Sequence, residues 1–153
     1  MAKAILVFGS SSGNTEVLAE SVSEGLEQGG LQVTVKNVTD AMTEELNDYD
    51  LIVLGCPTYE EGDLQEDFIP FYEKMEGLSL NGKKAAVFGP GSEDMYPETF
   101  CKAVDTLEEK LKACGAEIVT TSLKINTGEV GEEVEDEARE EAQAWAVDLV
   151  KSL

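Results

Sequence analysis

Four hydroxyl-bearing side chains gather in a short loop near the amino terminus, where they could bind an anion. The apolar run Ala4 to Phe8 ends at Gly9, and an amphipathic pattern begins at Glu16. Backbone N–H groups at the start of a helix lack partners and, with the helix dipole, favour a phosphate. The residues of this loop are Ser10, Ser11, Ser12, Gly13, Asn14 and Thr15. The loop has no lysine or arginine, which a triphosphate-binding loop would use, so we expect a monophosphate.

Two further loops each carry a tyrosine and follow apolar runs. Tyr59 lies in the loop after Leu51 to Gly55, and Tyr96 in the loop after Lys84 to Gly89. Because parallel strands bring their carboxyl ends to one edge of a sheet, both tyrosines should lie near the phosphate loop. Stacked rings contribute about 0.5 to 1.5 kcal/mol beyond area burial. Together the three loops predict a flat, phosphorylated ligand.

The residue composition disfavours acid–base and metal-dependent chemistry. The chain has no histidine, which is the commonest general base and metal ligand. Its three cysteines, Cys56, Cys101 and Cys114, are too scattered for a disulfide framework or metal site, and we expect each to be a small buried residue.

The net charge of the chain and the lengths of its apolar runs limit which partners it can bind and where in the cell it can reside. The formal net charge is -21, which repels nucleic acid and anionic membranes and attracts basic protein surfaces. No apolar run approaches the ~20 residues of a membrane-spanning helix, and no secretory signal precedes the phosphate loop. We expect a cytoplasmic protein in which residues 1–153 form one domain.

Strand and helix patterns alternate along the chain. Continuous apolar runs predict central strands at Ala4 to Phe8, Leu51 to Gly55 and Lys84 to Gly89; alternating runs predict edge strands at Gln32 to Val38 and Thr120 to Ile125. Helical spacing predicts helices over Asn14 to Glu27, Met42 to Leu46, Gln65 to Met75 (starting or kinked at Pro70), Pro97 to Cys114 and Glu132 to Leu153. This alternation indicates an α/β three-layer sandwich with helices on both faces of a five-stranded parallel sheet. The order 2-1-3-4-5 places the alternating strands at the edges and the ligand loops at the switch point.

Over nearly its whole length the chain resembles a flavodoxin, of the short-chain type found in sulfate-reducing bacteria. The resemblance rests on Gly-Ser-Ser-Ser-Gly-Asn-Thr after the first strand, Leu-Gly-Cys-Pro-Thr-Tyr after the third, Leu-Gln-Glu-Asp-Phe-Ile-Pro, and later Phe-Cys-Lys-Ala-Val-Asp and Gly-Ala-Glu-Ile-Val. It implies noncovalent FMN, with its phosphate on Ser10 to Thr15 and on Thr58, which follows Pro57, and with its ring between aromatic side chains. Tyr59 stands where such proteins usually have the inner tryptophan. The resemblance implies main-chain contacts to the pyrimidine end of the flavin from Pro90, Gly91, Ser92 and Cys101.

Two loops depart from the family pattern. The loop after the fourth strand is about two residues longer than usual, so either Tyr96, which we favour, or Met95 covers the outer flavin face. The loop after the third strand is about two residues shorter, and Glu60 follows Tyr59 where glycine is common. In the family this peptide is thought to turn when the flavin is reduced, and a non-glycine residue at positive φ costs about 1 to 2 kcal/mol.

The resemblance implies a low-potential, one-electron carrier rather than an enzyme. We expect a monomer that binds basic-surfaced redox proteins, such as reductases, oxidoreductases and cytochromes, transiently. An alternative is an FMN-dependent quinone or nitro reductase on the same fold, although no nicotinamide fingerprint is present. A third is a flavin-free phosphoacceptor domain, although that class places acidic residues where this chain has Gly9 and Ser10.

Overall fold

The structure is a computed structural model that describes residues 3–9, 14–59, 63–64, 66–91, 101–126 and 136–153. Its strands are β1 (Lys3–Phe8), β2 (Gln32–Asn37), β3 (Leu51–Gly55), β4 (Thr58–Tyr59), β5 (Asp63–Leu64), β6 (Lys84–Gly91), β7 (Glu117–Ile118) and β8 (Leu123–Asn126). Its α-helices are α1 (Asn14–Gln28), α2 (Phe68–Lys74), α3 (Lys102–Ala113) and α4 (Asp136–Lys151), and its 3-10 helices are η1 (Val38–Asp40) and η2 (Thr43–Asp48).

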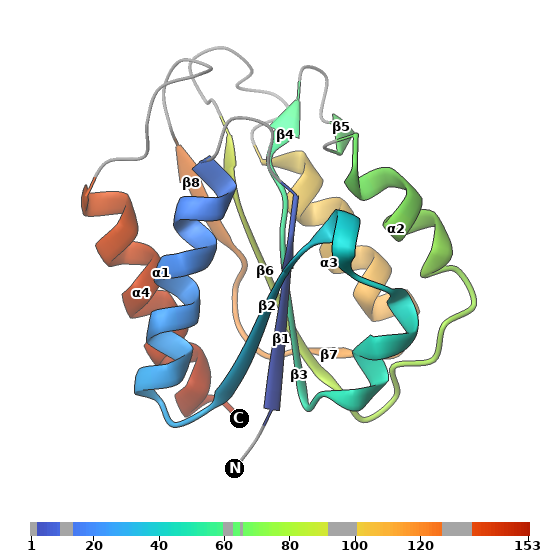
Figure 1. The fold of residues 1–153 in the computed structure, drawn as a ribbon, viewed down its shortest axis with the longest axis horizontal. Helices are drawn as coiled ribbons and strands as arrows, with labels where there is room; N and C mark the ends of the chain where they lie inside the picture. Colours follow the sequence, from blue (N-terminus) through green and yellow to red (C-terminus); the bar gives the residue numbers. More distant parts are fainter. Residues whose placement is uncertain (1–2, 10–13, 60–62, 65, 92–100, 127–135) are drawn as a thin grey trace.

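The main sheet is parallel and has helices on both faces. Its order is β2-β1-β3-β6-β7, and β8 pairs with β6 further along the same edge. Figure 1 shows α1 and α4 on one face of the sheet and α2 and α3 on the other. Since β7 and β8 together occupy the place of a fifth strand, the predicted order 2-1-3-4-5 and the three-layer architecture are confirmed.

Alternate residues of the central strands feed two separate hydrophobic cores. Along β1, Ile5 and Val7 face the core under α2 and α3, whereas Leu6 and Phe8 face the core under α1 and α4. The same alternation holds along β3 and β6. Because both faces are buried, these strands read as continuous apolar runs, which is why the sequence located them well.

Helices α1 and α4 pack closely because a glycine stands at their contact. A Cβ atom on Gly25 would lie 2.4 Å from the carbonyl oxygen of Gln143 and 2.6 Å from Cβ of Ala146. Both distances are too short for a real Cβ contact. Gly25 therefore sets how closely the two helices approach.

The predicted fifth strand, Thr120 to Ile125, is wrong at its start. The structure instead has two short strands: Ile118 of β7 pairs with Ala85, and Leu123 of β8 pairs with Phe88. Four residues, 119–122, thus stand opposite the two residues 86–87 of β6 and break the ladder. The indole Nε1 of Trp145 donates a hydrogen bond to the carbonyl oxygen of Thr121 at 2.9 Å, a long-range contact that strand periodicity cannot reveal.

Other element boundaries differ from expectation for local reasons. Helix α2 begins at Phe68, so Pro70 lies in the first turn, where its missing N–H costs no helical bond. Helix α3 begins at Lys102, because Cys101 has a left-handed backbone with φ 52° and cannot belong to it. Residues 97–100 of the predicted helix lie outside the described residues. The first four residues expected in the last helix, 132–135, lie outside the described residues.

The segment after β2 forms two 3-10 helices, where the sequence predicted one short helix over Met42 to Leu46. Glu45 fixes this segment with both carboxylate oxygens. Oε1 accepts from Nζ of Lys36 at 2.6 Å, and Oε2 accepts from the backbone N–H of Met42 at 2.9 Å. The hydrogen bond from Lys36, followed by that from Met42, lowers the pKa of Glu45 below its ordinary value.

The close contact of α1 with α4 yields a stability prediction. Gly25→Ala should lower the free energy of unfolding by about 1 to 2 kcal/mol, because crowding against Gln143 outweighs the better helix propensity of alanine. Urea denaturation followed by circular dichroism measures the change. Glu20→Ala, at an exposed position of the same helix, is the matched control and should not destabilise. A Gly25→Ala protein as stable as the Glu20→Ala protein would contradict the proposed close packing.

The two hydrogen bonds to Glu45 predict a pH-dependent contribution to stability. Because folding lowers its pKa, ionised Glu45 stabilises the fold above the glutamate pKa of the unfolded chain, about 4.3, and this contribution is lost as the pH falls through the lower folded value. Glu45→Gln should therefore be less stable than the parent at pH 7, and the difference should shrink below about pH 4. Urea denaturation at several pH values tests this, with Glu44→Gln as the control. A difference independent of pH would argue against the ion pair as its source.

Candidate functional site

Three neighbouring strands end at the same level, and the chain leaves the sheet there on three loops. Phe8 pairs with Gly55, and Gly55 pairs with Phe88. Beyond this row, the N–H of Gly9 donates to the carbonyl oxygen of Gly55 at 3.0 Å, and the N–H of Cys56 donates to that of Phe88 at 3.2 Å. The loops after β1, β3 and β6 therefore start side by side, as the switch-point prediction requires.

Two glycines at this edge occupy positions where a side chain does not fit. A Cβ on Gly55 would lie 2.3 Å from the ring of Phe88, and a Cβ on Gly89 would lie 2.2 Å from the carbonyl oxygen of Cys56. Phe88 in turn packs near Trp145, with ring centroids 6.2 Å apart. Glycine at these two positions leaves room for the ring of Phe88 and for the carbonyl of Cys56.

On the first loop, the structure describes the end that belongs to α1. The helix starts at Asn14, as the sequence predicted, and runs for 15 residues. Thr15, in its first turn, is only 1% exposed, although it carries a hydroxyl group. Ser10, Ser11, Ser12 and Gly13 lie outside the described residues. A helix N-terminus with a buried hydroxyl is a neutral donor set suited to a phosphate.

The second loop contains a hairpin that the sequence did not predict. Thr58 and Tyr59 form β4, which pairs antiparallel with β5, so that Tyr59 stands opposite Asp63. The pair lies beside β6 and α3 near the carboxyl edge of the main sheet (Figure 1). Pro57, which leads into the hairpin, is buried, and Glu60 lies outside the described residues. A two-residue strand carries too little periodicity to be read from sequence.

On the third loop, the structure describes three of the four predicted main-chain residues, Pro90, Gly91 and Cys101. Strand β6 continues through Pro90 to Gly91, two residues further than expected, because it pairs there with β8. Cys101 is buried, and its thiol donates a hydrogen bond to the carbonyl oxygen of Gly89 at 3.5 Å. Ser92, Tyr96 and Met95 lie outside the described residues.

The backbone of Cys101 is strained. Its φ of 52° is in the left-handed region, which costs a residue with a Cβ about 1 kcal/mol. Its carbonyl oxygen accepts from the N–H of Val104 at 3.0 Å, which fixes the turn into α3. Strain of this kind gathers at binding sites. The sequence contains no signal for it, since cysteine has no preference for this conformation.

The cysteines behave as predicted. Cys56, Cys101 and Cys114 are buried, and none of them forms a disulfide bond. Burial raises the pKa of the Cys114 thiol, which donates to the carbonyl oxygen of Met75. Among the residues that the structure describes, no group of three His, Cys, Asp or Glu side chains could hold a metal ion. None of the described helices is long and apolar enough to cross a membrane.

The donors at the strand ends fit FMN. The start of α1 has backbone N–H groups and the hydroxyl of Thr15, which could bind a phosphate. The hairpin places the backbone of Tyr59 near the same edge, and the strained turn at Cys101 lies beside Gly89. These three features lie on the loops after β1, β3 and β6, which begin side by side.

Comparison with known proteins agrees with this geometry. The flavodoxin family model matches residues 6–145. A flavodoxin of Maridesulfovibrio salexigens is 44% identical, and one of Nitratidesulfovibrio vulgaris is 37% identical; each match covers 100% of both chains. The structure of oxidised flavodoxin 1 of Bacillus cereus is 36% identical, with a TM-score of 0.89 over 99% of both chains.

These matches extend over nearly the whole chain. Flavodoxins are electron-transfer proteins that carry FMN, and the comparisons do not favour the reductase alternative. The chain therefore belongs to the flavodoxin family, and it is an FMN-binding electron carrier rather than an enzyme.

Proposed function

We propose that the three loops at the carboxyl edge of the sheet hold FMN in a defined orientation. The phosphate binds at the start of α1 and on Thr58, and the ring lies between Tyr59 and Tyr96. Main-chain groups of the third loop and of Cys101 bind the pyrimidine end. The full set is Ser10, Ser11, Ser12, Gly13, Asn14, Thr15, Pro57, Thr58, Tyr59, Glu60, Pro90, Gly91, Ser92, Tyr96 and Cys101.

The observation that carries this proposal is the buried hydroxyl of Thr15 in the first turn of α1. A threonine so fully removed from water needs polar partners, and the neighbouring N–H groups of the helix start point to an anion. The left-handed turn at Cys101 supports this orientation of the ring, because its thiol donates a hydrogen bond to the carbonyl oxygen of Gly89 and so holds the turn beside the third loop. The phosphate and ring ends of the site are thus set by different helices, α1 and α3.

The charge of the protein favours a low reduction potential. Bound FMN supplies the one-electron chemistry, and the protein sets how easily that electron is added. With 32 acidic and 11 basic residues, the chain surrounds the site with negative charge, which opposes the addition of an electron. The same field would speed encounters with basic-surfaced redox proteins such as reductases, oxidoreductases and cytochromes. The proposed carrier is a single-domain, cytoplasmic monomer.

The phosphate site is tested by removing one hydroxyl group. Thr15→Val keeps the shape of the side chain but removes a hydrogen bond to a charged ligand, so the dissociation constant of FMN should rise about tenfold. Titration of the FMN-free protein, followed by flavin fluorescence, measures it. Thr34→Val in β2 makes the same change away from the site and should leave the affinity unchanged. Equal affinities of the two variants would contradict the proposed phosphate site.

The proposed role of Glu60, the residue after Tyr59, is tested by measuring the midpoint potential of the bound flavin. Glu60→Gly should raise the midpoint potential of the first one-electron couple by about 40 to 90 mV, because glycine accepts positive φ without the cost that glutamate incurs. Redox titration followed by visible absorption measures this potential. Glu61→Gly removes the same charge without changing residue 60. A shift of equal size in both variants would assign the effect to charge rather than to backbone conformation.

A further inference from the structure

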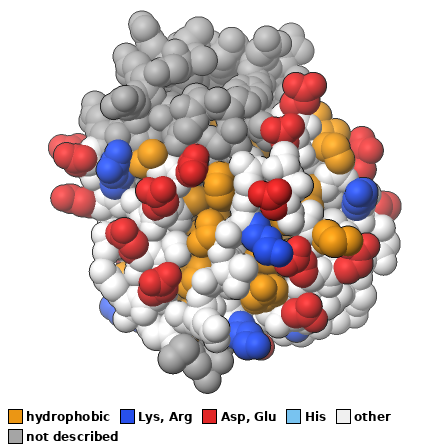
Figure 2. All heavy atoms as spheres, in the orientation of Figure 1, with side chains coloured by type: hydrophobic (Ala, Val, Ile, Leu, Met, Phe, Trp, Pro, Cys, Tyr) orange, Lys and Arg blue, Asp and Glu red, His pale blue; other side chains and the backbone are white. Residues whose placement is uncertain are grey.

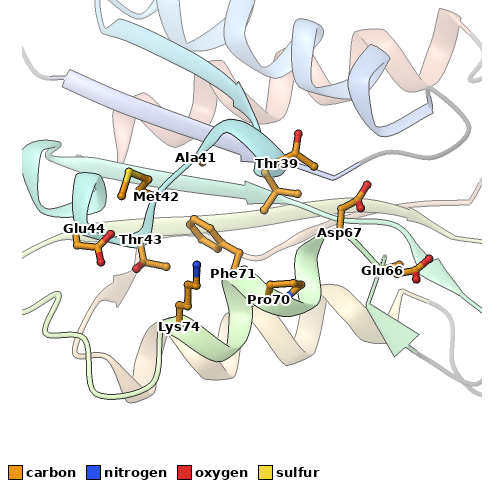
Figure 3. Close-up of a pocket in the computed structure, with 11 residues that line it drawn as sticks. Thr39, Ala41, Met42, Thr43, Glu44, Glu66, Asp67, Pro70, Phe71 and Lys74 are labelled. Atoms are coloured by element: carbon orange, nitrogen blue, oxygen red, sulfur yellow. The ribbon is translucent and has the colours of Figure 1, made fainter.

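A groove separates the 3-10 segment after β2 from helix α2, and it contains both apolar and acidic side chains. Its volume is about 770 Å³, and we call it the η–α2 groove. Phe71, at its floor, is almost fully buried, whereas Met42, on its wall, is 63% exposed. In Figure 3, Phe71 and Lys74 reach from α2 towards the opposite segment, which carries Met42 and Thr43. An apolar side chain entering the groove would bury Met42.

The wall that carries Met42 is held in place before anything binds. The carboxylate of Glu45 accepts from the backbone N–H of Met42 and from Lys36, which tethers the segment to β2. Thr43, the next residue, is buried and lines the groove. A preorganised wall lowers the cost of ordering side chains on binding. The exposed side chain of Met42 therefore projects from a backbone that is already held in place.

Acidic side chains stand at both ends of the groove. Glu66 and Asp67 lie at one end and Glu44 lies towards the other, while Lys74 is the basic residue of its lining (Figure 3). In Figure 2, acidic side chains are likewise interspersed with apolar ones across the visible face of the molecule. An apolar centre with an acidic rim complements a segment in which an apolar residue is flanked by lysine or arginine.

The acidic end near Glu66 adjoins the proposed flavin site. Glu66 and Asp67 follow the β4–β5 hairpin after a single intervening residue, Gln65, and that hairpin carries Tyr59. A segment lying along the η–α2 groove would therefore hold the rest of its protein against the loop that covers the flavin. This continuity selects a redox partner as the occupant over an unrelated ligand.

Resting on the proposed electron-carrier function, we propose that the η–α2 groove docks a basic redox partner through one apolar anchor residue flanked by lysine or arginine. Met42 and Phe71 receive the anchor, and Glu44, Glu66 and Asp67 contact the basic side chains. The apolar contact persists in high salt, whereas the charged contacts are screened.

Anaerobic stopped-flow mixing with a lysine-rich c-type cytochrome tests the docking site. FMN-loaded protein, reduced with dithionite and freed of excess reductant, gives one electron to each ferric haem, which becomes ferrous. Glu44→Lys should lower the bimolecular rate constant about two- to fivefold at ~10 mM ionic strength. Glu73→Lys makes the same charge change on an exposed residue of α2 outside the groove, and it should have a smaller effect.

The apolar contact is tested in the same assay at ~0.5 M salt, where charges are screened. Met42→Ser should lower the rate constant about threefold, whereas Ile69→Ser, which removes a 39% exposed residue of α2 outside the groove, should leave it unchanged. FMN absorption and midpoint potentials, unchanged in all four variants, show that the carrier itself is intact.

The outcomes separate the two proposals. If each variant matches its control while the parent protein reduces the cytochrome with a salt-sensitive rate, the groove proposal is overturned and the proposed function stands. If the FMN-loaded parent protein does not reduce the cytochrome, or does so at a rate independent of salt, the proposed basic-surfaced partner class is overturned, and the groove proposal with it.

Discussion

The register of three central strands is the constraint on which the rest of the structure depends. Phe8, Gly55 and Phe88 lie in one row across β1, β3 and β6, so three loops leave the sheet together. Glycine at positions 55 and 89 leaves room at these strand ends, since a Cβ at either would overlap Phe88 or Cys56. Slipping one strand by a single residue would exchange its two faces and separate the loops. Core packing and cofactor geometry are therefore set by the same pairing.

The protein binds an anionic cofactor although its own net charge is strongly negative. The loop before α1 has no lysine or arginine, so at the proposed site the phosphate would be held by N–H groups and hydroxyls. Such donors are dipoles, which attract the phosphate at short range without neutralising the charge of the whole protein. Cofactor binding can thus be strong while the surface keeps the field that attracts basic partners.

The sequence predicted best those elements that are determined by residues close together in the chain. The buried strands and α1 follow from apolar runs and helical spacing, and their bounds agree with prediction to within a residue or two. The break in the fifth strand depends on Trp145, 24 residues away from Thr121, and has no local signal. The start of α3 depends on the left-handed Cys101, which a proline-led helical pattern concealed. The proposed FMN site rests on local motifs, whereas the η–α2 groove requires two segments to be placed side by side.

The broken strand at the far edge of the sheet has a consequence for solubility. An open sheet edge presents unpaired N–H and C=O groups that can template pairing with a second chain. Here residues 119–122 interrupt the edge, and Trp145 occupies the carbonyl of Thr121, so β7 and β8 offer only two short ladders instead of one long one. The hydrogen bond from the Trp145 indole to the Thr121 carbonyl therefore opposes edge-to-edge pairing of two chains. Without it, only the repulsion between the two negative net charges would oppose that pairing.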